Sequence, residues 1–111
     1  MLDTERHNQL VDAVFDLAPV IPVLAIDRIE DAVPLCRALV DNGLPVLEIT
    51  LRTACALDAI REVARELPDA CVGAGTVLTA DDLAKVWEAG ARFAISPGVT
   101  ETLYRAAAQS P

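Results

Sequence analysis

The sequence predicts an α/β fold, an N-terminal helix followed by four βα units, as in one half of a (βα)₈ barrel. Short apolar stretches typical of buried strands begin near residues 20, 46, 71 and 92, and a segment of helical periodicity follows each. Successive strands are spaced by about 20 to 26 residues, which indicates one repeated βα unit. Near-continuous apolar strands alternating with amphipathic helices favour a parallel sheet covered by helices.

The length of the chain limits the architecture. Its 111 residues form at most one domain, whereas an eight-unit barrel typically needs about 200 residues or more. We therefore expect a single partial domain over residues 1–111. Three explanations stay open: a fragment, an open four-stranded sheet, or two copies that complete one another.

The N-terminal segment is predicted to be a helix, within residues 1–18. One face of Asp3 to Leu17 carries the apolar side chains, which suits a cap or an oligomer contact. The first strand is expected over residues 19–26. Its two prolines lack N–H groups, and therefore suit the start or edge of a sheet.

The first unit is completed by a helix that is expected to begin at Glu30 and to stop at Gly43. Its predicted inner face consists of Ala32, Leu35, Cys36, Leu39 and Val40. Pro34 should then lie in or near the first turn, where amide hydrogens have no partner inside the helix. A strand follows over residues 46–53, and Thr53 is placed as the N-cap of a helix over 54–67 that ends before Pro68.

The last two units follow the same order. A third strand is predicted over residues 71–77, and Thr79 or Asp81 caps a helix that reaches Glu88, with Leu83 and Trp87 facing inward and Gly90 ending it. A fourth strand is predicted over residues 92–96. After a turn at Pro97-Gly98, a last helix should run from Thr100 to about residue 109.

A carboxylate in the middle of the second strand points to function. Alternation places Leu47, Ile49 and Leu51 on one side, and Val46, Glu48, Thr50 and Arg52 on the other. The apolar side should pack on helices, and the polar side should lead towards a site. A buried carboxylate needs a cation, hydrogen bonds, water or a shifted pKa.

Further candidate groups lie where the other strands end, since functional groups of βα barrels collect there. They are Gly73, Gly75 and Thr76 after the third strand, and Ser96, Pro97 and Gly98 after the fourth. The G-A-G-T segment is too poor in glycine for a dinucleotide fingerprint. Its glycines are expected to allow close approach of another backbone or a ligand, while Thr76 offers a hydroxyl.

Composition excludes several classes of function. The net charge of −8 with no basic stripe argues against binding nucleic acid. The apolar runs are too short to span a membrane, and the first residues lack the order of a signal peptide, so we expect a cytoplasmic location. Cys36 and Cys71 fall in core-like patterns typical of buried thiols, while His7, the sole histidine, belongs to a polar segment. The sequence offers no cluster of histidine and cysteine for a metal site.

Three motifs together resemble one family. E-I-T-L-R-T (48–53), V-G-A-G-T-V (72–77) and F-A-I-S-P-G (93–98) are similar to segments of the 2-keto-3-deoxy-6-phosphogluconate / 4-hydroxy-2-oxoglutarate (KDPG/KHG) aldolases. P-V-I-P-V and the A-V-P-L helix match as well. The resemblance runs from about Pro19 to Ala108, in the family's order and spacing.

The resemblance implies the N-terminal half of a (βα)₈ class I aldolase of carbohydrate metabolism. In such enzymes a lysine forms a Schiff base with pyruvate or the 2-keto acid substrate, and no metal or other cofactor is needed. Glu48 matches the general acid/base, Arg52 and Thr76 match residues that hold the pyruvyl carboxylate, and Ser96, Pro97 and Gly98 match a wall of the site. Family members commonly form trimers.

The nucleophile of the family is expected to be absent from this chain. It belongs to a sixth strand, beyond residue 111, and the sole lysine, Lys85, lies mid-helix beside acids that favour its charged form. The chain alone is therefore expected to be inactive. Two other interpretations stay open: a non-catalytic half-barrel that pairs with itself or a complementary half, and a barrel enzyme that transfers protons with Glu48 and no Schiff base.

Overall fold

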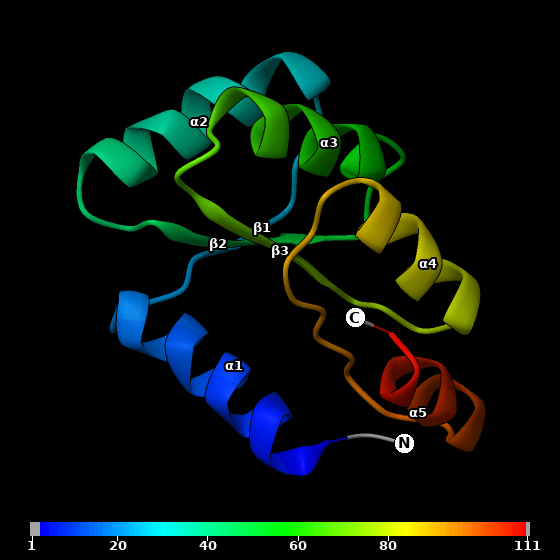
Figure 1. Ribbon diagram of the computed structural model, residues 1–111. Coiled ribbons are helices and arrows are strands. Elements are labelled where there is room, and N and C mark those ends of the chain that lie inside the picture. The colour runs from blue at the N-terminus through cyan, green and yellow to red at the C-terminus, as the bar shows by residue number, and fades with distance from the viewer. Residues whose placement is uncertain (1–2, 111) are drawn as a thin grey trace.

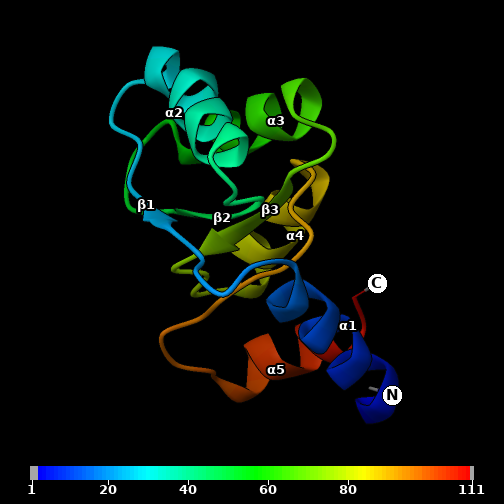
Figure 2. The ribbon, with the colours of Figure 1, turned by 90° about the vertical axis from the view of Figure 1, so that its left-hand side faces the viewer.

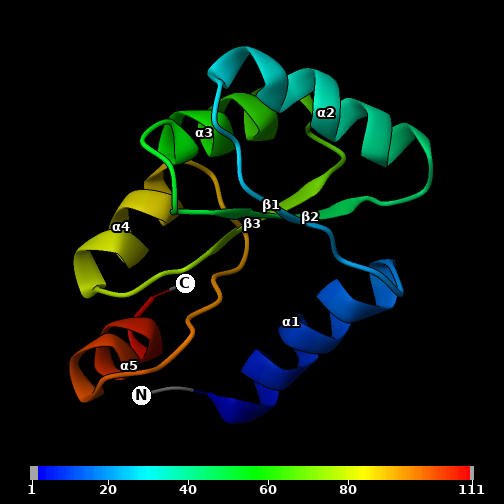
Figure 3. The same cartoon turned by 180° about the vertical axis from the view of Figure 1, so that it is seen from behind.

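The computed structural model describes residues 3–110 and confirms an α/β fold with a parallel sheet. Its elements are α1 (Thr4–Leu17), β1 (Val23–Leu24), α2 (Ile29–Asp41), β2 (Val46–Thr50), α3 (Ala56–Glu66), β3 (Cys71–Gly75), α4 (Ala80–Glu88) and α5 (Glu101–Ala108). Both strand pairs are parallel, in the order β1-β2-β3. Helices α2 to α5 follow one another around the sheet, and α1 lies across the sheet from α2 and α3 (Figures 1 and 3).

The register of the sheet places Glu48 of β2 opposite Gly73 of β3, and Thr50 opposite Gly75. All five residues of β2 are buried, as are all five of β3. Figure 2 shows the three strands from the side, with α2 and α3 on one face and α1 on the other. The two sides of β2 that the alternation predicts therefore face different parts of the molecule, one towards α2 and α3 and the other towards α1.

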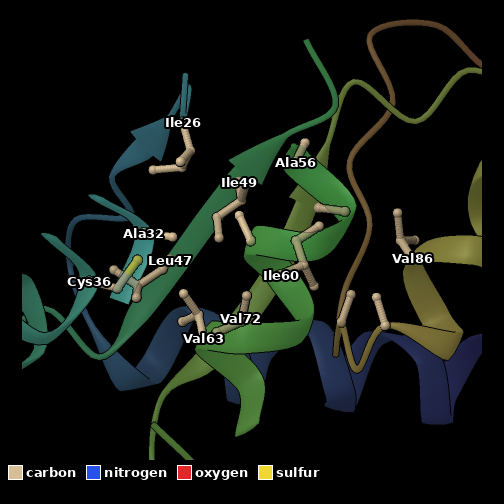
Figure 4. Close-up of a cluster of buried hydrophobic side chains, with 14 of the residues drawn as sticks. Ile26, Ala32, Cys36, Leu47, Ile49, Ala56, Ile60, Val63, Val72 and Val86 are labelled. Carbon is tan, nitrogen blue, oxygen red and sulfur yellow. The ribbon is translucent and has the colours of Figure 1, made fainter. Parts of the chain in front are cut away.

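The main core lies between the sheet and helices α2, α3 and α4. Leu47 and Ile49 of β2 are fully buried there, and Ile60 and Val63 of α3 belong to the same cluster (Figure 4). A second, smaller cluster forms on the other face. It joins Val46 and Cys71, at the start of their strands, to the end of α1, and consists of Ala18, Val46 and Cys71 with Val14, Ile21 and Phe93 around them.

The strands are shorter than the sequence predicts. β1 keeps only two of the eight residues expected over 19–26, with both prolines before it, and β2 ends at Thr50 instead of residue 53. β3 ends at Gly75 instead of residue 77. β2 and β3 end together, because Thr50 and Gly75 are the last paired residues of their ladder, whereas β1 ends at Leu24 although β2 continues to Thr50.

The fourth strand, expected over residues 92–96, is reduced to one bridge between Ala74 and Ala94. Four backbone hydrogen bonds still join this segment to the chain around β3, among them Arg92 N–H to Val72 O at 2.8 Å and Ile95 N–H to Ala74 O at 2.8 Å. Ala94 remains exposed. Residues 92–95 thus form the outer edge of the sheet in the described part of the chain.

Two helix predictions are wrong in detail. Pro34 is the sixth residue of α2, because the helix begins at Ile29, so it lies in the second turn and leaves one helical hydrogen bond unformed. Leu35 is 41% exposed and Trp87 is 44% exposed, although both were expected to face inward. Their neighbours Cys36, which was also expected to face inward, and Val86, which was not, are fully buried in the core.

Most predicted helix ends are confirmed. Thr79 and Thr100 cap α4 and α5 through their hydroxyls, which accept hydrogen bonds from Asp82 N–H and Leu103 N–H. Gly43 and Gly90 follow α2 and α4 with φ of +93° and +102°, the left-handed conformation that glycine adopts readily. Thr53 does not cap α3, since Cys55 holds the N-cap position and makes no side-chain capping bond.

The remaining sequence expectations concern isolated residues. Cys36 and Cys71 are buried free thiols, as expected, and burial raises the pKa of Cys36 to about 11. Cys55 is a free, half-buried thiol, and His7 is exposed on α1. No helix between residues 3 and 110 is long and apolar enough to cross a bilayer.

Candidate active site

The carboxyl ends of β2 and β3 bring together the polar groups singled out in the sequence. Glu48 projects from the middle of β2, and Arg52 belongs to the turn that follows it. Thr76 directly follows the last residue of the neighbouring β3. Because parallel strands end at the same edge of a sheet, Arg52 and Thr76 lie at one edge, and Glu48 lies two residues before the end of β2.

Glu48 is 8% exposed, one of two buried polar residues in the described part of the chain. Its carboxyl group occupies space that Gly75 leaves free, because a Cβ on Gly75 would collide with Oε1 of Glu48. Gly73 similarly accommodates the ring of Phe93. The two glycines were expected to admit a backbone or a ligand. They admit side chains of this chain instead.

Burial raises the pKa of Glu48 above its ordinary value, and the nearby charge of Arg52 opposes this shift. Desolvation is the larger effect. The Glu48 carboxyl is therefore less acidic than a glutamate side chain in open solvent.

Arg52 is exposed on the turn over residues 51–55. No ion pair or side-chain hydrogen bond within residues 3–110 engages its guanidinium, whereas five other basic side chains there pair with acids. A guanidinium presents paired N–H donors that match a carboxylate. Arg52 is thus available to an anionic ligand at the edge that Glu48 faces.

Thr76 has a backbone φ of +60°, the one non-glycine residue with positive φ among residues 3–110. This conformation is unfavourable for a β-branched side chain, and such strain is concentrated at functional sites. The adjacent Val77 N–H donates to Ile95 O at 3.1 Å, which fixes the backbone beyond the strained residue. The fold therefore holds the Thr76 side chain in an orientation that a relaxed backbone would not give.

The predicted wall of the site at residues 96–98 is a local turn. The Ser96 hydroxyl donates to Gly98 O at 2.8 Å and accepts from Gly98 N–H at 3.3 Å, with Pro97 exposed between them. Nothing in the sequence indicated the contacts that Thr53 and Cys55 make. Both donate to the carbonyl oxygen of Ile26 and so tie the turn that carries Arg52 to the segment after β1.

Lys85 lies on α4, where its ammonium group pairs with Asp81 at 2.6 Å and its side chain is 53% exposed. The hydrogen bond to Asp81 raises the pKa of Lys85. A Schiff-base nucleophile must be neutral, so Lys85 has the wrong environment, as expected from the sequence. Between residues 3 and 110, no group of three or more His, Cys, Asp or Glu side chains is placed to hold a metal ion.

A cavity of about 530 Å³ lies on the α1 side of the sheet, between α1, α4, the end of α5 and residues 91–95. Leu10, Phe15 and Trp87 line it, together with Phe93 and Ile95. Neither Glu48, Arg52 nor Thr76 contributes to its wall. This hollow is therefore separate from the polar edge.

Comparisons with known proteins decide the family. The model of a family described as KDPG and KHG aldolase matches residues 11–111. The chain belongs to this family. It is 55% identical to the KHG/KDPG aldolase of Escherichia coli strain K12 over 98 residues, which cover 88% of this chain and 46% of that protein.

Solved structures of the KDPG/KHG aldolase family have the same fold over the matched part. The KDPG aldolase of Legionella pneumophila, with pyruvate captured as a covalent carbinolamine intermediate, is 50% identical, with a TM-score of 0.85 over 88% of this chain and 48% of that one. The Zymomonas mobilis ZM4 aldolase with 3-phosphoglycerate is 55% identical, with a TM-score of 0.82 over 87% of this chain and 46% of that one. The chain thus spans about half the length of the relatives it matches.

Proposed function

We propose that this chain supplies the proton-transfer and carboxylate-binding half of a class I aldolase site. The observation that carries the proposal is the buried Glu48, its pKa raised by desolvation, near Arg52, which forms no ion pair within residues 3–110, in a chain of the KDPG/KHG aldolase family. The substrate class is a 2-keto acid. Either 2-keto-3-deoxy-6-phosphogluconate is cleaved to pyruvate and glyceraldehyde 3-phosphate, or 4-hydroxy-2-oxoglutarate is cleaved to pyruvate and glyoxylate.

Each residue has one task in this proposal. Arg52 and the hydroxyl of Thr76 hold the carboxylate of the pyruvyl part, through charge-assisted hydrogen bonds. Glu48 accepts and returns protons during carbinolamine formation and cleavage of the carbon–carbon bond. Pro97 lies at the wall of the site. The amine that attacks the keto group comes from a lysine outside these 111 residues, since Lys85 is held charged by Asp81.

The same proposal extends to architecture. The four segments made of a strand followed by a helix correspond to four units of an eight-unit barrel, and two features support this interpretation. The segment 92–95 leaves one edge of the sheet open, and the face beyond Val46 and Cys71 carries exposed apolar side chains such as Val23 and Ile95. A complementary half, or further copies of the chain in a homo-oligomer such as a trimer, would cover them.

The names of the relatives favour one of the three interpretations that the sequence left open: an aldolase, a barrel enzyme without a Schiff base, or a non-catalytic half-barrel. The matched proteins of Escherichia coli and Dickeya dadantii are named aldolases, and the Legionella pneumophila aldolase holds pyruvate as a carbinolamine. This favours a lyase over a barrel enzyme that works without a Schiff base. It also favours a catalytic role over a purely structural half-barrel.

A chimera tests the proposal. In the chimera, this chain replaces the matched 46% of the Escherichia coli relative. The chimera and the 111-residue chain are each treated with pyruvate and borohydride, and their intact masses are measured by mass spectrometry. We expect a reduced pyruvate adduct on the chimera, mapped by peptide analysis outside these 111 residues, and none on the chain alone. An adduct on Lys85, or a chimera with native circular dichroism and no adduct, would overturn the proposal.

A further inference from the structure

The turn between β2 and α3 is tied to the segment after β1 through a single carbonyl group, that of Ile26. Thr53 Oγ1 donates to Ile26 O at 2.5 Å, and Cys55 Sγ donates to the same oxygen at 3.0 Å. The two donor atoms lie 3.8 Å apart. A carbonyl oxygen has two lone pairs, so both bonds form at once. Thr53 and Cys55, which follow Ile26 by 27 and 29 positions in the sequence, are thereby both bonded to it.

These two bonds anchor the turn on the side that Arg52 occupies. Leu51 N–H donates to Gly75 O at 3.0 Å and closes the β2–β3 ladder before Arg52. Thr53, the residue after Arg52, is held by its hydrogen bond to Ile26 O. The side chain of Arg52 has no hydrogen bond to any residue between 3 and 110, so its direction depends on how its backbone is held on both sides.

We propose that Thr53 is a positioning residue that, with Cys55 as a second tie, holds Arg52 beside Glu48. Its importance for substrate binding rests on the proposed function, but the geometry does not. Burial raises the pKa of Glu48, and the charge of Arg52 lowers it. If the Thr53 hydrogen bond is lost and the turn is released, Arg52 moves away from Glu48 and lowers this pKa less.

The pKa of the Glu48 side chain reports this coupling directly. We would measure it by ¹³C NMR titration of the complete 111-residue chain and of five variants: Thr53→Val, Thr53→Ser, Arg52→Gln, the double variant Arg52→Gln/Thr53→Val, and Thr100→Val. Valine keeps the shape of threonine and removes the donor, whereas serine keeps the donor. Thr100 is the matched control, because its hydroxyl caps α5, an element remote from Glu48.

We expect Thr53→Val to raise the pKa of Glu48 by at least half of the rise that Arg52→Gln causes. Thr53→Ser should restore the wild-type value, and Thr100→Val should leave it unchanged. In the double variant, loss of the Thr53 hydroxyl should add nothing to Arg52→Gln, because Thr53 acts through Arg52. An unchanged pKa in Thr53→Val, or an additive double variant, would overturn the proposal.

The outcome is independent of whether the aldolase proposal holds, since the titration needs no nucleophile. In the active chimera, Thr53→Val should raise KM for the 2-keto acid more than it lowers kcat, and Thr53→Ser should reverse this effect. A normal KM together with a shifted Glu48 pKa would leave the positioning role intact and remove Arg52 from substrate binding. The two claims therefore fail separately.

Discussion

The Glu48 carboxyl sits in space that Gly75 leaves, almost out of water and near one guanidinium. This arrangement has a thermodynamic cost. The pKa of Glu48 in the folded chain lies above its ordinary value of 4.5, so the folded state binds the proton more tightly than the unfolded state. The stability associated with the protonated carboxyl is present below pH 4.5 and is lost as the pH rises through the folded pKa.

Glu48→Gln should therefore change how stability depends on pH. Relative to this variant, the wild-type chain should lose free energy of unfolding as the pH rises from 4.5 through the pKa of folded Glu48. Urea denaturation at a series of pH values measures the difference. Glu88→Gln, at an exposed position on α4, is the control. Parallel pH profiles for wild type and Glu48→Gln would contradict the burial argument.

Gly75→Ala should displace the same carboxyl. The added Cβ collides with the end of the Glu48 side chain, which can swing into solvent, so the pKa of Glu48 should fall towards its ordinary value. Gly98→Ala is the matched control, since nothing lies within 4 Å of a Cβ built there. NMR titration of Glu48 in both variants checks this. A pKa that stays raised in Gly75→Ala would show that Gly75 does not make room for the carboxyl.

Helices, strands and most helix ends were predictable from periodicity and capping residues, but the ends of the strands were not. β2 stops at Thr50 because its partner β3 stops at Gly75, before the positive φ of Thr76, and ladder pairing is invisible in one sequence. Thr53 has the residue type and position of an N-cap. Its hydroxyl instead bonds Ile26, 27 residues away, because tertiary contact outweighs local preference.

Two aliphatic side chains show where the predicted helix faces agree with the structure and where they differ. Ile60 of α3 is fully buried, whereas Leu35 of α2 is 41% exposed although its spacing suggests a core position. Ile60→Ala should cost about 2–5 kcal/mol of stability, and Leu35→Ala less than about 1 kcal/mol. Urea denaturation of both variants measures this. Equal losses would mean that α2 presents the face predicted from sequence.

The molecule as a whole leaves apolar side chains uncovered on the α1 side of its sheet. Leu10, Phe15 and Trp87 are each between 44% and 61% exposed around the 530 Å³ cavity. Patches of this kind usually mark interaction surfaces. A sequence pattern indicates that such a face exists, because α1 is amphipathic. It cannot say whether the chain itself covers the face.

The 111-residue chain should consequently associate with itself. We expect its weight-average mass in sedimentation velocity to rise with concentration, and Leu10→Ser to reduce that rise. Leu78→Ser is the matched control, because Leu78 is 51% exposed, against 54% for Leu10, and lies outside the cavity. A concentration-independent monomer would contradict the expectation, as would equal effects of the two variants.

The most direct test of the central claim is the turnover of the chimera with and without the Glu48 carboxyl. The rate of 2-keto acid cleavage would be divided by the fraction of protein that borohydride traps with pyruvate, which removes differences in folding and in Schiff-base formation. If Glu48 transfers protons in the reaction, Glu48→Gln should lower this normalised rate by about 10²-fold or more. A normalised rate within about twofold of the parent, well short of the factor that such a base contributes, would show that this half of the site holds the substrate without performing the chemistry.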